Sequence, residues 1–404
     1  MIKEIESKIN KILLEKDFTD SEVFSLIKKE IDKSSKKEYL SIDQKIAMAD
    51  KIYSRIKGFG ILDDLLSDDT VSEIMINGYN RIFIEQNGKL LLSPLQFESK
   101  KQLEDIVFKM VGKAGREINT ANPIVDIRLC SGERVNVVIE PVVSTGPTVT
   151  IRKFPEKAIN AKDLIKNNTV TIEAMNFLEK LVKTKYNIFI SGGTSAGKTT
   201  LLNVLTNFIG EKERIVLIED SAEIRLNSKI KNYVSMEVRQ VNSAGVGEIT
   251  VRDLIKTSLR MRPERIIVGE VRGAEAIDML QAMNTGHEGS MSTGHSNSAN
   301  DMFSRLETMI LQSYDNIPLI AIKDMIASSI DIVVHISRMR DFSRHITEIS
   351  EVTGHQNGKI SLNPIYLFKE DEKSKIDKVS GKLVRTDRPF INDFKLKLGG
   401  FYEN

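Results

Sequence analysis

Apolar residues in the first part of the chain recur at the spacing of helix faces. Two such sets predict two short amphipathic helices: Ile2, Ile5, Ile9, Ile12 and Leu13, followed by Val23, Leu26, Ile27 and Ile31. Ser41 and Gln44 form a capping box before a third helix, whose apolar pattern stops near Gly58. Acidic residues on the polar faces favour a docking role over a membrane-surface helix. We therefore expect an N-terminal helical region over residues 1–57.

From Val71 the pattern changes to short apolar runs that are typical of strands. The predicted strands cover residues 73–76, 81–85, 89–92, 126–129, 134–139 and 148–152. Asn87-Gly88 supplies a hairpin turn, and a helix with one apolar face follows around residues 103–111. These elements predict a small α+β domain over residues 58–154. Pro155 and the polar residues after it suggest an interdomain linker over residues 155–168.

After the linker, helical patterns alternate with short apolar strands, which predicts an α/β domain with a parallel sheet. The strand candidates are residues 187–191, 214–218, 265–268, 289–293 and 330–336, followed by a turn at 354–358 and a last strand at 365–368. We expect this domain to span residues 169–370. Residues 371–404 are charged and weakly patterned, so they are treated as a C-terminal tail without an assigned structure.

A complete phosphate-binding loop follows the strand at residues 187–191 and precedes an apolar helix. It comprises Gly192, Gly193, Thr194, Ser195, Ala196, Gly197, Lys198 and Thr199, with Thr200 next in the chain. In such loops the backbone amides surround phosphate oxygens, the lysine neutralises phosphate charge and the threonine hydroxyl ligates Mg²⁺. The strand and helix around the motif are its required context. The sequence therefore predicts a RecA-like P-loop motor domain that binds ATP and Mg²⁺ and hydrolyses ATP.

Acidic residues stand where two further strands of the sheet should end. Glu219 and Glu223 follow one strand, and Glu270 follows another. Carboxylates at the carboxyl ends of parallel strands face the nucleotide crevice, where one can hold Mg²⁺ or its water and another can polarise the attacking water. Because Gly269 replaces the usual aspartate, Glu270 should act on Mg²⁺ partly through water. A structural role as a helix cap is the alternative for each carboxylate taken alone.

A polar run around two histidines, His287 and His295, comes before a predicted helix. Eight positions separate the two histidines and no cysteine is near, so zinc binding is a poor interpretation. We expect His295 to lie at a strand end, where it can respond to the γ-phosphate. Capping of the next helix is the alternative.

Composition limits the other classes of function. The formal net charge is +2 at pH 7, so no general electrostatic attraction to nucleic acid or to an anionic membrane is expected. The single cysteine, Cys130, excludes an internal disulfide framework. No apolar run approaches the roughly 20 residues of a membrane span, and no signal peptide is recognisable. We expect a cytoplasmic protein that reaches the inner face of the cell membrane only through partners.

Four motifs in this order resemble those of the type II and type IV secretion ATPase superfamily. They are the phosphate loop, Ile218-Glu219-Asp220, Val268-Gly269-Glu270-Val271-Arg272 and the histidine run. The N-terminal half looks like the CpaF branch, the motors of tight-adherence (Flp) pilus systems. That likeness lies in Gly58-Phe59-Gly60-Ile61-Leu62, in residues 71–78 and in Thr150-Ile151-Arg152-Lys153-Phe154. The resemblance covers roughly residues 45–368.

This resemblance implies a homo-hexameric ring in which ATP binds between each N-terminal domain and a neighbouring motor domain. It implies that Arg128, Arg134 and Arg152 reach phosphates, with Arg134 and Arg152 in a catalytic role. Arg260 and Arg272 would lie near the subunit junction, Arg272 beside the nucleotide. The family often has two prolines after the Arg134 ribbon, whereas Glu140 precedes Pro141 here. Its expected partner is a polytopic platform protein of the inner membrane.

The preferred function is a motor that converts ATP hydrolysis into domain motion for pilus assembly, pilus retraction or protein secretion. A nucleic-acid translocase would share the loop and sheet, but no tryptophan is present and the net charge is close to zero. A nucleotide-controlled scaffold with little turnover is a third possibility, which the intact acidic residues disfavour. The direction of the motor and the identity of the water-activating glutamate are left open.

Overall fold

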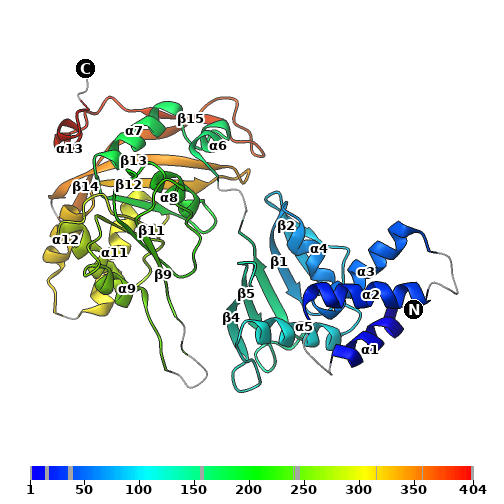
Figure 1. The fold of residues 1–404 in the computed structure, drawn as a ribbon. Helices are drawn as coiled ribbons and strands as arrows, with labels where there is room; N and C mark the ends of the chain where they lie inside the picture. Colours follow the sequence, from blue (N-terminus) through cyan, green and yellow to red (C-terminus); the bar gives the residue numbers. More distant parts are fainter. Residues whose placement is uncertain are drawn as a thin grey trace. The chain divides into compact units, whose positions relative to one another are not determined.

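The computed structural model describes residues 2–13, 18–34, 40–154, 159–239, 241, 246–314, 316–356 and 358–401. The chain forms two compact units, Met1–Glu156 and Lys157–Asn404 (Figure 1). Residues 155–158 of the expected linker lie outside the described residues. No helix in the described ranges is long and apolar enough to cross a membrane.

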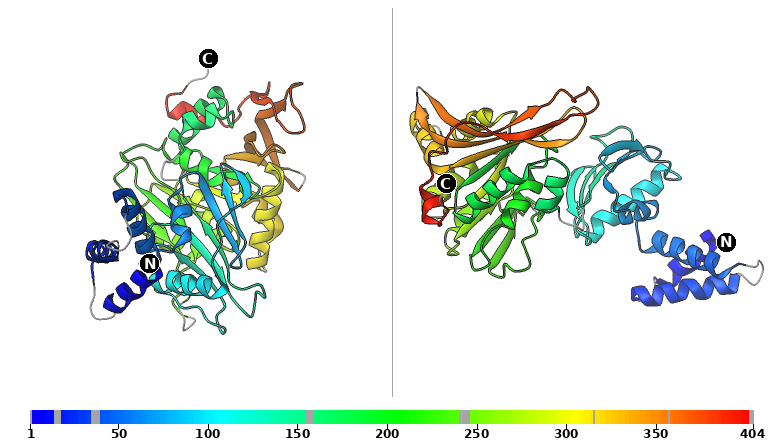
Figure 2. Two further views of the ribbon diagram at one scale, coloured as in Figure 1. Left: turned by 90° about the vertical axis from the view of Figure 1, so that its right-hand side faces the viewer. Right: turned by 90° about the horizontal axis from the view of Figure 1, so that it is seen from above.

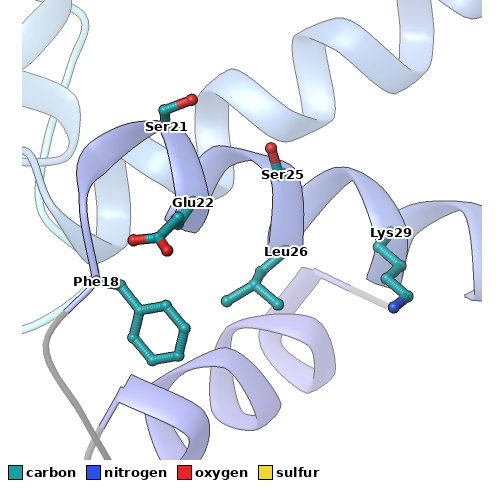
Figure 3. A pocket seen from close by; sticks show the side chains of 6 residues that line it. All are labelled: Phe18, Ser21, Glu22, Ser25, Leu26 and Lys29. Carbon is teal, nitrogen blue, oxygen red and sulfur yellow. The ribbon is translucent and has the colours of Figure 1, made fainter.

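Three helices form a small bundle at the start of the first unit. They are α1 (Ile2–Leu13), α2 (Asp20–Ser34) and α3 (Ile42–Ile56), and the predicted capping box of Ser41 and Gln44 is present. The predicted apolar faces meet in a core that includes Ile5, Ile9, Val23, Ile27, Ile31, Ala49 and Ile52. A pocket of about 360 Å³ on the bundle is lined by Phe18, Ser21, Glu22, Ser25, Leu26 and Lys29 (Figure 3). None of the predicted site residues lines it.

A six-stranded antiparallel sheet forms the rest of the first unit, in the order β3-β2-β1-β6-β5-β4. Its strands are β1 (Val71–Asn77), β2 (Ile82–Gln86), β3 (Lys89–Leu92), β4 (Ile124–Arg128), β5 (Arg134–Val138) and β6 (Thr148–Arg152). Each predicted strand is present. Helices α4 (Ile61–Ser67) and α5 (Lys100–Lys113) share a core with alternate strand residues. The α+β architecture follows from these short alternating patterns.

The second unit is built on a nine-stranded sheet, in the order β15-β14-β13-β12-β7-β11-β10-β8-β9. The strands from β12 to β9 in this order pair in parallel: β7 (Ile188–Gly192), β8 (Ile215–Glu219), β9 (Tyr233–Glu237), β10 (Arg265–Val268), β11 (Met291–His295) and β12 (Ile332–Arg338). Three antiparallel strands continue the sheet beyond β12: β13 (Arg344–Gln356), β14 (Lys359–Glu370) and β15 (Gly381–Arg385).

Helices cover both faces of this sheet (Figures 1 and 2). One face packs against α6 (Ala161–Lys166), α7 (Ile172–Lys183) and α8 (Lys198–Thr206). The opposite face packs against α9 (Val251–Ser258), α10 (Glu275–Asn284), α11 (Ala299–Ser313) and α12 (Leu319–Ser329). Successive residues of one strand, such as Ile188 and Phe189, belong to the two different cores because strand side chains alternate between faces. The predicted α/β class is correct.

Several predicted boundaries differ from the structure. Helix α6 occupies part of the expected linker, where Asn160 and Asp163 form a capping box. Strand β11 begins two residues later than predicted, so His295 is its last residue. Strand β9 was not predicted, because this edge strand has only exposed and half-buried residues. The described part of the expected tail, residues 371–401, contains β15 and α13 (Phe394–Leu398) and buries Leu383, Phe390 and Leu396 in the core of the second unit.

Candidate nucleotide-binding site

The phosphate loop connects buried strand β7 to the first residue of α8. Ser195 and Gly197 have φ angles of 56° and 101°, in the left-handed region that a tight loop needs. A Cβ atom on Gly192 would lie 2.3 Å from the backbone oxygen of Ile336, so only glycine fits at that position. The residues from Gly193 to Ser195 are exposed, whereas Lys198 is buried at the start of α8. The loop therefore presents its backbone to solvent above a helix N-terminus, the arrangement that binds anions.

Lys198 stands at the centre of the site. Its Nζ donates hydrogen bonds to the backbone oxygens of Gly192 and Gly193, at 3.1 and 2.9 Å. The same Nζ lies 3.1 Å from Nδ1 of His295 at the end of β11. Thr199 and Thr200 are half-buried in the first turn of α8. The loop thus places the cation of Lys198 next to the end of β11.

A second chain of contacts starts at His295 and crosses to β10 and β8. Nε2 of His295 lies 2.8 Å from Oε1 of Glu270. Arg272 donates to Oε2 of Glu270 at 2.8 Å and lies 2.9 Å from Oδ2 of Asp220. Lys198, His295, Glu270 and Arg272 are therefore brought together as one polar cluster, although the sequence separates them by up to 97 positions.

The alternatives left open for His295 and Glu270 do not fit this geometry. The next helix, α11, is capped by the side chain of Ser298 rather than by His295. Glu275 instead of Glu270 accepts from the backbone amides before α10. Burial lowers the pKa of His295, and the nearby carboxylate of Glu270 only partly opposes this effect. A neutral imidazole can accept from Lys198 at Nδ1. Its Nε2 lies close to Oε1 of Glu270, a buried oxygen without a hydrogen-bond partner among the described residues.

Glu219 is buried at the end of β8, and its side chain binds the backbone of the loop that follows this strand. Its Oε1 accepts from the backbone amides of Glu223 and Ile224, both at 3.0 Å. Its Oε2 is buried without a hydrogen-bond partner among the described residues. Burial is the largest cause that raises the pKa of Glu219, to about 7. A structural role therefore fits Glu219, although it holds a loop and does not cap a helix, whereas Glu223 is half-exposed beside it.

Gly269 lies close to a side chain of the neighbouring strand. A Cβ atom at Gly269 would lie 3.2 Å from Cγ of Glu219, closer than most side-chain contacts allow. The methylene groups of Glu219 thus border the space that a side chain at position 269 would use. A larger residue at position 269 would therefore require the Glu219 side chain to shift.

Two site residues were missed by sequence reasoning. Nε of Arg344 on β13 donates to the backbone oxygen of Ser195 at 2.9 Å. Nδ1 of His335 on β12 lies 2.8 Å from Oγ of Ser191, at the end of β7, and burial lowers the pKa of His335. Neither residue belongs to a recognisable motif. Only the parallel pairing of β12 with β7 brings them to the loop.

The three N-terminal arginines lie together in the first unit. Arg128 pairs with Arg134, and Arg134 pairs with Arg152, so they follow one line across β4, β5 and β6. Arg128 and Arg152 are exposed and Arg134 is half-buried. Nε of Arg128 donates to the backbone oxygen of Gly132, and Arg152 lies 3.9 Å from Glu73. This line of positive charge belongs to a different unit from the phosphate loop.

A strand, a glycine-rich loop and a helix in a largely parallel sheet define the RecA-like class of P-loop folds. A family model described as "Type II/IV secretion system protein" matches residues 56–372. The chain belongs to this family.

Similar proteins agree with this membership. A putative conjugal transfer protein of Mycobacterium tuberculosis is 31% identical over 305 residues, covering 74% of this chain and 86% of the relative. The conjugal transfer protein TrbB of Rhizobium radiobacter is 31% identical over 310 residues, which cover 76% of this chain and 91% of TrbB. Among solved structures, the ATPase DotB of Yersinia pseudotuberculosis has the same fold, with a TM-score of 0.52 and 17% identity over 72% of this chain and 78% of DotB.

Proposed function

We propose that this chain is an ATPase that converts ATP hydrolysis into domain motion. The observation that carries the proposal is the cluster of Lys198, His295, Glu270 and Arg272 beside the phosphate loop. It places a phosphate-binding cation and a carboxylate on the same polar network. Such a network can hold a triphosphate and alter its contacts when the terminal phosphate leaves.

The residues present fit a magnesium nucleotide. Thr199 offers a hydroxyl in the first turn of α8, and Glu270 offers a carboxylate at the end of β10, both hard oxygen donors of the kind Mg²⁺ prefers. Bound Mg²⁺ would neutralise charge on the phosphates. His295 would report the terminal phosphate to Glu270. The backbone of residues 192–200 would hold the phosphate chain.

The two glutamates after β8 should have different roles. Both backbone contacts of Glu219 are directed to its own loop, so we assign it to positioning. Glu223 is half-exposed at the end of that loop and is the better group to polarise the attacking water. Replacing each in turn by glutamine separates these roles.

We further propose a homo-hexamer in which Arg128, Arg134 and Arg152 of one subunit meet the nucleotide of its neighbour, with Arg260 and Arg272 near the junction. Their alignment on three adjacent strands supports a common anionic target. Aligned guanidinium groups attract a polyanion in addition to the carboxylate of Glu73 near Arg152. A triphosphate at a subunit junction supplies that charge.

The system that the motor serves is proposed from the family and from the N-terminal motifs. We favour the CpaF branch of tight-adherence pilus motors, acting on a polytopic inner-membrane platform protein from the cytoplasmic side. Relatives named as conjugal transfer proteins support work in a secretion or transfer machine. Direct binding of nucleic acid is not expected.

Steady-state phosphate release by the full chain, with and without single-stranded DNA, tests the proposed function. The motor proposal predicts magnesium-dependent ATP turnover that DNA leaves unchanged. Stimulation of turnover by DNA would favour a translocase. Binding of ATP without turnover would favour a scaffold.

A further inference from the structure

The hairpin formed by β12 and β13 contacts the phosphate loop from the side away from the acidic cluster. In the sheet, β12 lies on one side of β7, and β11 and β10, which carry His295 and precede Glu270, lie on the other. Ile336 of β12 pairs with Gly192. Arg344 of β13 donates to the backbone oxygen of Ser195 and approaches Gly197. The hairpin is therefore part of the wall of the same site.

An exposed aromatic ring stands in the turn of this hairpin. Phe342 is 64% exposed, and the guanidinium of Arg338 lies 4.8 Å from its ring centre. Arg338 pairs directly with Arg344, so their side chains share one face of the hairpin. The backbone of Phe342 has a φ angle of 66°, a conformation that a bulky residue rarely adopts. Neither burial nor backbone preference explains a phenylalanine at this position.

The next hairpin holds this turn in place. Asp341 accepts from the backbone amides of Ser343 and Val379, at 3.0 and 2.6 Å. Arg340 donates through both terminal nitrogens to Glu370, at 2.7 and 2.8 Å, and through Nε to the backbone oxygen of Lys375 at 3.0 Å. Because these contacts fix the backbone of the turn, the exposed ring of Phe342 is pre-organised for a ligand.

We propose that Phe342 is the platform for the base of the bound nucleotide, and that Arg344 positions this platform against the phosphate loop. The inference rests on the proposed function, which places the terminal phosphate at Glu270 and His295. The opposite end of the nucleotide then points toward β12 and β13. With Arg338 on one face of the ring, the other face is available to an adenine. Stacking on an aromatic ring binds any base, so we expect little discrimination between ATP and GTP.

Isothermal titration calorimetry of the full chain with ADP and with inorganic tripolyphosphate tests this inference. Phe342→Ala should weaken ADP binding at least about fivefold, the lower end of what base stacking contributes, and leave tripolyphosphate binding unchanged. Phe394→Ala is the matched control, because Phe394 is 66% exposed in the same unit. Unchanged ADP affinity in Phe342→Ala would overturn the inference. Absence of ADP and tripolyphosphate binding in the wild type would instead overturn the proposed function, and the inference with it.

A fluorescence readout distinguishes stacking from a general effect on the fold. The chain contains no tryptophan, so Phe342→Trp introduces a single reporter. ADP should quench this fluorescence and tripolyphosphate should not, whereas Phe394→Trp should respond to neither. Adding Arg344→Ala to Phe342→Trp should reduce the quench at saturating ADP, because the platform is no longer held against the loop. Equal responses to ADP and tripolyphosphate would show that the ring senses the loop rather than the base.

Discussion

Glu219 is a buried carboxylate whose burial raises its pKa to about 7 from an ordinary value of 4.5. The folded state therefore binds this proton more tightly than the unfolded state does. The resulting contribution to stability is full below about pH 4.5 and is lost as the pH rises to about 7, on the order of 3 kcal/mol. Glu219→Gln should remove this loss. Urea unfolding of the wild type and Glu219→Gln at pH 5 to 8, without nucleotide, measures this difference. If the free energy of unfolding changes with pH in the same way in both proteins, the prediction is wrong.

Loss of the Glu223 carboxylate should slow ATP hydrolysis more than loss of the Glu219 carboxylate. In single-turnover hydrolysis, Glu223→Gln should slow the chemical step by roughly 10²-fold, the lower range for a positioned general base. Glu219→Gln should slow it less, because its amide oxygen can still accept from the backbone of Glu223 and Ile224. Full activity in Glu223→Gln would exclude it as the group that polarises water.

The C-terminal segment is a structural part of the second unit. Phe390 is 7% exposed, and its ring lies 5.5 Å from that of Phe177 and 5.7 Å from that of Tyr186. Phe390→Ala should lower the free energy of unfolding by about 3 to 5 kcal/mol, whereas exposed Phe394→Ala should change it by less than about 0.5 kcal/mol. Chemical denaturation of both variants provides the measurement. Equal stabilities would mean that this segment does not support the core.

Features carried by one stretch of sequence were predictable, whereas contacts between distant stretches were not. The phosphate loop with its flanking strand and helix, and the strands of the first unit, follow from local patterns. Arg344 and His335 reach the loop only because β12 pairs with β7, and local sequence does not encode that pairing. The close approach of Glu219 to Gly269 likewise comes from a neighbouring strand.

Coupling between subunits is the property that belongs to the whole assembly. If Arg134 and Arg152 act across a junction, rings that mix Lys198→Ala subunits with Arg134→Ala, Arg152→Ala subunits contain some junctions with both halves intact. Phosphate release should then exceed that of either variant alone, because an arginine at the transferring phosphate accelerates the reaction by up to about 10³- to 10⁵-fold.

Native mass spectrometry must first confirm that the rings are mixed. A titration of wild-type subunits with Lys198→Ala subunits is the control, since a loss steeper than proportional would show that one inactive site stops the ring. No gain in confirmed mixed rings, together with a proportional titration, would contradict action across the junction.

The measurement that tests the central claim most directly is magnesium-dependent ATP turnover in three matched proteins, combined with ATP binding. The wild type should turn over ATP, Lys198→Ala should lose turnover, and Glu270→Gln should bind ATP but hydrolyse it slowly. These outcomes follow because Lys198 supplies the charge at the loop, whereas glutamine keeps the size of Glu270 but not its charge. Turnover by Lys198→Ala near the wild-type rate would contradict the account.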